Sequence, residues 1–120
     1  MSSFKRFEDI NAWQKARELV NMLHSVTNAG KLKNDYSLKD QLNRAGLSIM
    51  LNIAEGFGRR SNKEFINFLV MSHGSAAEIQ SAMYAAIDRN YVDKDTFDAI
   101  YSRCEEISKM IMGLIKYLRD

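Results

Sequence analysis

The side chains that most often bind metals or act as nucleophiles are sparse in this sequence and do not cluster. A zinc site needs several ligands at short, defined spacings, yet His24 and His73 are far apart and Cys104 has no histidine or cysteine three or four positions away. Ser75 follows His73 and a glycine, but a hydrolase serine sits on a turn between a strand and a helix, and this triplet falls inside a predicted helix. The sequence therefore predicts neither a metal site nor a nucleophilic serine.

Two other patterns could in principle support chemistry. Glu55 and Glu78 are carboxylates of the kind that act as general acid and base, but the neighbouring arginines favour ion pairing and nothing in the sequence indicates a substrate cleft. Gly56-Phe-Gly58 lies at a predicted helix end and matches neither the phosphate-binding loop nor the dinucleotide fingerprint. We expect no catalytic residues, no cofactor and no enzymatic activity.

Long amphipathic helices must position whatever residues do carry function. The 120-residue chain contains no proline, the residue that breaks helix interiors, and it shows no strand-like alternation. Apolar residues recur at three- and four-residue steps, which predicts helices at about residues 10–29, 38–57, 62–88 and 94–118. The expected fold is all-α, an up-down four-helix bundle formed by residues 1–120 as a single domain.

Polar residues and glycines predict where these helices begin and end. Gly30 should follow the end of the first helix, and the hydroxyl of Ser37 should cap the start of the second. Ser61 and Glu64 form a capping box for the third helix. Asp93 is the expected cap of the fourth helix.

The two middle helices carry more apolar residues than a single core stripe requires. A helix in a four-helix monomer buries one stripe, so a second stripe predicts contact with another copy of the chain. The alternative is that one middle helix lies centrally within the monomer and is covered by the others. The residues expected at the interface between copies are Leu47, Met50, Leu51, Ile66, Val70 and Tyr84.

A narrow polar line follows the second helix, and its members fall within about 80° of one another: Gln41, Arg44, Ser48, Asn52, Glu55 and Arg59. A second polar line, on the third helix, contains Glu64, Ser75 and Glu78. We expect the two lines to face each other in a structural polar seam in which Arg44 and Arg59 pair with carboxylates of Glu55, Glu64 or Glu78, because buried charges need partners. Alternatively, Arg44, Arg59 and Arg60 contact phosphates. The seam comprises Gln41, Arg44, Ser48, Asn52, Glu55 and Glu78.

Charge is unevenly divided along the chain. Residues 1–60 carry ten basic and six acidic groups, and residues 61–120 carry seven and nine, so the halves are +4 and −2. This imbalance permits a basic face for nucleic acid, although it is also compatible with an ordinary solvated surface. The candidate nucleic-acid contacts are Lys5, Arg6, Lys15, Arg59 and Arg60.

A single cysteine and the lack of a long apolar run favour a cytoplasmic protein without membrane contact.

The middle of the chain resembles a known family. The resemblance covers most of the chain and is most specific at Asn52-Ile-Ala-Glu-Gly-Phe-Gly-Arg59. It also includes the segments Phe7–Ile10, Trp13–Ala16, Ser37–Ala45, Leu47–Arg60, Lys63–Phe65, Gly74–Glu78 and Asn90–Tyr91. These residues resemble the four-helix bundle proteins encoded in intervening sequences of bacterial 23S ribosomal RNA genes. The sequence departs from the family pattern at Ser37, Asn43 and Met50, where glycine, arginine and proline are usual.

The resemblance implies an up-down four-helix bundle that assembles into a barrel-like homopentamer. Similar proteins include the accessory variability subunits of diversity-generating retroelements, which bind nucleic acid and a reverse transcriptase through basic surfaces. The leading hypothesis is therefore an oligomeric scaffold or adaptor that presents its basic residues to RNA or to an RNA-handling protein. The alternative is a protein-interaction scaffold with no nucleic-acid role.

Overall fold

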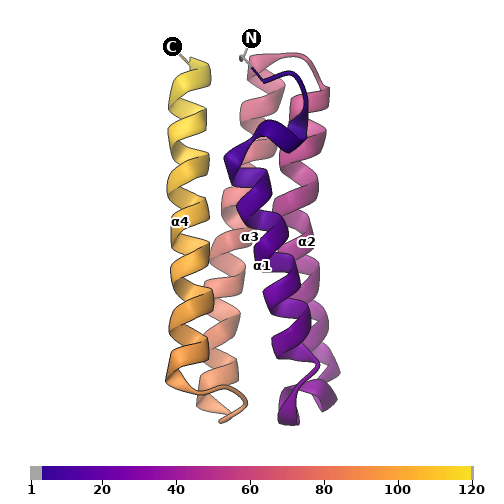
Figure 1. Ribbon diagram of the computed structural model, residues 1–120, viewed down its shortest axis with the longest axis vertical. Helices are drawn as coiled ribbons and strands as arrows, with labels where there is room; N and C mark the ends of the chain where they lie inside the picture. Colours follow the sequence, from indigo (N-terminus) through magenta and orange to yellow (C-terminus); the bar gives the residue numbers. More distant parts are fainter. Residues whose placement is uncertain (1–3, 120) are drawn as a thin grey trace.

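The computed structural model describes residues 4–119 as an all-α fold dominated by four long helices, with no strand in that range. Two short 3-10 helices, η1 and η2, precede and follow the first long helix (Figure 1). In chain order the elements are η1 (Phe7–Asp9), α1 (Asn11–Thr27), η2 (Gly30–Asn34), α2 (Tyr36–Gly58), α3 (Asn62–Asp88) and α4 (Lys94–Arg119). The predicted all-α class and the number of long helices are confirmed.

The four long helices lie side by side and give an elongated molecule of 45 × 19 × 19 Å. Each long helix contacts the next along the chain, α4 also contacts α1, and the α2–α3 contact is the most extensive. Both chain ends and the α2–α3 connection lie at one end of the molecule, and η2 and the α3–α4 connection lie at the other (Figure 1). Residues far apart in sequence are thus gathered at each end.

The helix starts agree with the sequence at two of three predicted caps. The Ser61 hydroxyl accepts a hydrogen bond from the Glu64 backbone N–H at 3.4 Å, and Asp93 accepts one from the Thr96 N–H at 2.8 Å. The Ser37 cap was wrong: α2 begins at Tyr36, two residues before the predicted start, and the Asp35 carboxylate caps it by accepting from Leu38 N–H at 3.2 Å. A carboxylate accepts this hydrogen bond while also favouring the positive end of the helix.

The end of α1 also differs from the prediction. This helix stops at Thr27, and Gly30, at φ +56°, starts η2 instead of following α1 directly. Asn28 donates from its side chain to the carbonyl oxygen of His24 at 2.8 Å. A side-chain donor thereby satisfies one of the carbonyls left free at the helix end.

A continuous apolar core runs the length of the molecule between the four helices. Cys104 of α4 is fully buried within it, and burial raises the pKa of its thiol to about 12. The thiol therefore stays protonated and serves as a small apolar group, as its place on the α4 stripe predicts.

The α2–α3 packing depends on a glycine near the end of α2. A Cβ placed on Gly56 would lie 2.7 Å from the Cβ of Phe68, 3.0 Å from the Phe65 ring and 3.3 Å from the Phe65 carbonyl oxygen. Only a residue without a side chain allows the two helices to approach this closely. The contact also sets the direction of the connection that follows Gly58.

A second fixed point lies at the opposite end of the molecule. The Asp35 carboxylate that caps α2 also accepts hydrogen bonds from the Tyr91 hydroxyl at 2.9 Å and from Arg89 at 3.0 Å. The backbone N–H of Leu38, followed by the Tyr91 hydroxyl, lowers the pKa of Asp35. This carboxylate therefore joins the start of α2 to the α3–α4 connection.

The Gly56 contact predicts opposite effects for two Gly→Ala substitutions. We expect Gly56→Ala to lower the free energy of unfolding by about 1–3 kcal/mol, because the added methyl group meets backbone and Cβ atoms that cannot move independently. The matched control is Gly113→Ala in α4, where a Cβ meets nothing within 4 Å and better helix propensity should add up to about 1 kcal/mol. Urea unfolding followed by circular dichroism measures both. Equal stability of the two variants would contradict the close approach.

The Asp35 network predicts an acid-sensitive contribution to stability. Because the folded state lowers the pKa of Asp35 from its ordinary 3.8, the unfolded chain binds the proton more readily, and the stabilisation is present above about pH 5 and lost as the pH falls below about 4. We expect Asp35→Asn to lower the melting temperature at pH 7 and to flatten its decline between about pH 5 and 3. Asp40→Asn is the control, since Asp40 is 67% exposed and lies 3.7 Å from Arg44. An unchanged decline in Asp35→Asn would contradict the network's role.

Candidate nucleic-acid interface

The α2–α3 connection and the two terminal segments lie at the same end of the molecule (Figure 1), and each of these segments contains basic residues. The amide of Asn62, at the start of α3, donates to the carbonyl oxygen of Leu118 at 3.2 Å, which ties this connection to the last turn of α4. We call the following set the basic end: Lys5, Arg6, Arg59, Arg60, Lys63, Lys116 and Arg119. Acidic residues also occur in these segments, but the basic groups outnumber them.

Four of the five predicted nucleic-acid contacts belong to the basic end. They come from two segments more than 50 residues apart in sequence, the N-terminal segment and the α2–α3 connection. The fifth, Lys15, lies on the flank in α1 and pairs with Glu18 at 3.8 Å. Sequence reasoning missed Lys63, Lys116 and Arg119, because all three lie in the acidic half of the chain. Only the fold brings Lys116 and Arg119 to the same end as the α2–α3 connection.

The cations of the basic end differ in how far they are neutralised. Arg6 pairs with Glu8 at 2.7 Å, and its guanidinium lowers the pKa of that carboxyl. Arg59 pairs with Glu55 at 2.8 Å and lies 3.9 Å from Glu64. These acidic partners reduce the charge that either arginine presents to an anion.

Arg60 is different from its neighbour. Within residues 4–119 it has no acidic partner at ion-pair distance, and its guanidinium lies 6.0 Å from the centre of the Phe57 ring. The guanidinium of Arg59, by comparison, lies 5.0 Å from the Phe68 ring. Arg60 therefore presents its charge to solvent beside an aromatic side chain.

The polar line of the sequence analysis lies along the outer edge of the α2–α3 contact. Across the contact, Gln41 donates to Glu78 at 3.1 Å and Ser75 donates to the Ser48 hydroxyl at 2.8 Å. Within α2, the Asn52 amide donates to the carbonyl oxygen of Ser48 at 2.8 Å and to its hydroxyl at 3.0 Å. The two lines thus meet, mainly through uncharged groups. The line fixes the register of α2 against α3.

The charged members of this line are not buried as expected. Arg44 is 76% exposed and pairs with Asp40 at 3.7 Å on its own helix, so it does not reach Glu78. Because solvent screens these charges, they need no partner across the contact. Sequence reasoning also missed Ser72, whose buried hydroxyl donates to the Ile49 carbonyl oxygen at 2.9 Å.

The residues predicted to contact another copy divide into two groups. Leu47, Leu51, Val70 and Tyr84 are 42–56% exposed, whereas Met50 and Ile66 are partly buried and pack against the core of the same chain. Met71 and Met112 are further exposed apolar side chains that the sequence analysis did not single out. The exposed group lies on α2, α3 and α4, and α1 contributes no large exposed apolar side chain.

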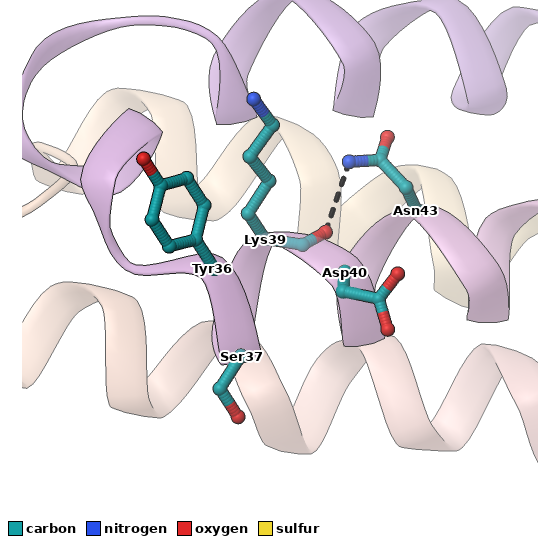
Figure 2. Close-up of a pocket in the computed structure, with 5 residues that line it drawn as sticks. All are labelled: Tyr36, Ser37, Lys39, Asp40 and Asn43. Atoms are coloured by element: carbon teal, nitrogen blue, oxygen red, sulfur yellow. Dashed lines mark hydrogen bonds between the residues drawn. The ribbon is translucent and has the colours of Figure 1, made fainter.

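A pocket of about 560 Å³ lies beside the start of α2, at the end opposite the basic residues (Figure 2). Two of its polar side chains bond within the chain: the Asn43 amide donates to the Lys39 carbonyl oxygen at 2.9 Å, as Figure 2 shows, and the Lys39 ammonium donates to Asn28 at 2.8 Å. Tyr36 stands 75% exposed at its edge. None of the predicted site residues lines this pocket.

Groups of three or more potential metal ligands are not found among residues 4–119. In the same range, no helix has the length and apolar character needed to cross a membrane.

These features define a class of protein: a chain of four long helices with a basic end and exposed apolar side chains on three of its helices. The comparisons then place it in a family. The model of the 23S rRNA-intervening sequence protein family matches residues 8–113, and the chain belongs to this family.

A solved structure has a similar fold. It is a protein of unknown function from the S23 ribosomal protein family of Bacteroides thetaiotaomicron VPI-5482, with a TM-score of 0.79 and 24% sequence identity. The match covers 88% of this chain and 95% of that chain. Comparison with curated proteins finds no similar sequence.

Proposed function

We propose that this protein is a non-enzymatic, cytoplasmic scaffold that assembles with copies of itself and binds RNA through the basic end. The observation that carries the proposal is the convergence of cations from three separate segments of the chain on one end of the molecule. Phosphate contacts dominate the affinity of most proteins for nucleic acid, and clustered lysine and arginine provide them. An RNA-handling protein is a further candidate partner of the assembled scaffold.

The exposed apolar side chains support the assembly part of the proposal. Leu47 and Leu51 lie one turn apart on α2, and Val70 and Met71 are adjacent on α3. Apolar groups at this density on a chain of only 120 residues favour a protein interface. In line with the family resemblance, we infer a barrel-like homopentamer of up-down four-helix bundles.

These apolar side chains also favour a second candidate function. In that case the protein is an interaction scaffold without a nucleic-acid role, and the basic end is a solvated surface. The experiments below distinguish the two functions.

A charge-reversal pair tests the RNA part. We expect a labelled single-stranded RNA of 20 nucleotides to bind at low salt and to dissociate steeply as salt rises, because binding releases counterions. Lys63→Glu with Lys116→Glu should weaken binding by about tenfold or more. The slope of log K against log salt should fall by about 0.7 for each phosphate group that the variant no longer binds.

The control for this pair is Lys31→Glu with Lys33→Glu in η2, at the opposite end of the molecule. Both double variants change the formal net charge from +2 to −2. An equal decrease in RNA affinity in the two double variants would show an effect of net charge alone. If the wild type does not bind RNA at low salt, the interaction scaffold remains as the function.

Assembly is tested separately by light scattering. We expect a mass several times 13.8 kDa for the wild type and a smaller mass for Leu51→Glu, because a buried, unpaired carboxylate opposes association. Tyr117→Glu is the control, since Tyr117 is similarly exposed at 54% but was not predicted at the interface. A wild-type protein that remains a single chain at all concentrations would contradict the assembly.

A further inference from the structure

The backbone at Arg60 has an unusual conformation. Its φ of +63° places it in the left-handed region, which is disfavoured for a residue with a Cβ. The chain adopts this conformation to turn from the end of α2 to Ser61, which caps α3. A glycine would make the same turn without strain.

The other left-handed positions are occupied by residues that suit them. Among residues 4–119 only Gly30, Arg60 and Asn90 have φ in this region. Glycine adopts it freely and asparagine tolerates it, whereas arginine does not belong to either class. The glycine nearest to Arg60 in the sequence is Gly58, where an added Cβ would meet nothing within 4 Å. This glycine is therefore not required by close packing, while the left-handed position two residues later is occupied by an arginine.

Strain of this kind is retained when the side chain has a use that a glycine lacks. The environment of Arg60 indicates that use: the side chain is exposed, has no acidic partner among the described residues, and precedes by three positions Lys63 in the first turn of α3. By contrast, Arg59 is engaged with Glu55 and Glu64. A guanidinium fork can bind two phosphate oxygens at once, which a lysine ammonium does with less geometric specificity.

We propose that Arg60 is the main phosphate-contact residue of the basic end and that it binds the phosphodiester backbone of single-stranded RNA. The inference rests on the proposed function and deepens it, because it assigns the strained residue of the α2–α3 connection to the ligand. Arg59, in contrast, is paired with Glu55 and lies beside the Phe68 ring, so less of its charge is available to a phosphate.

The test is Arg60→Gly, measured with a fluorescein-labelled single-stranded RNA of 20 nucleotides. The substitution relieves the backbone, so the melting temperature should be unchanged or higher, while RNA affinity falls several-fold and the salt slope decreases by about 0.7. Arg60→Lys should give an intermediate affinity, because it keeps the charge and loses the planar fork.

The matched control is Asn90→Gly, which changes the other non-glycine residue with a left-handed backbone, in the α3–α4 connection at the opposite end. It should leave RNA affinity unchanged. If Arg60→Gly binds RNA as well as the wild type while Lys63→Glu with Lys116→Glu binds weakly, the assignment of Arg60 is overturned and the proposed function stands. If the wild type binds no RNA at low salt, both are overturned.

Discussion

The close contact between α2 and α3 is the constraint on which the rest of the structure depends. Gly56 brings the helices together at one end, and the hydrogen bonds from Ser72 and Ser75 to α2 fix their register in the middle. A shift of one helix along the other is costly, since it would leave the buried hydroxyl of Ser72 without a partner. The contact therefore determines where the α2–α3 connection emerges.

The position of that connection explains the distribution of charge. The helix faces that pack on one another form the buried core, whereas the connections and terminal turns at the two ends lie largely in water. Lysine and arginine are costly to bury, so an end can hold many of them close together while the core stays apolar. At this end Arg6 and Arg59 are partly neutralised, whereas Arg60 has no acidic partner among residues 4–119. The electrostatic potential that an anion meets at the basic end therefore depends more on which of these arginines are paired than on the net charge of +2.

Periodicity was sufficient to predict the helices, because a core-facing stripe repeats with the helical period. The caps at Ser61 and Asp93 followed from local chemistry, but Asp35 could not be chosen over Ser37, since its advantage comes from Tyr91 and Arg89 more than 50 residues away. The basic end was predicted in part: Arg59 and Arg60 are adjacent in sequence, while Lys116 joins them only through the fold. The left-handed backbone of Arg60 gave no sequence signal, because only glycine or asparagine would have indicated it.

The two parts of the proposed function reinforce each other physically. One basic end offers few cations with free charge, and each exposed phosphate contact in water contributes little. In the proposed ring, identical copies present the same end on the same side, so one RNA strand can meet several basic ends in succession. Each contact after the first is then intramolecular, and the overall affinity rises well above that of one subunit without any new interaction. A small chain with a modest net charge can in this way hold a long polyanion, provided that the exposed apolar side chains keep the copies together.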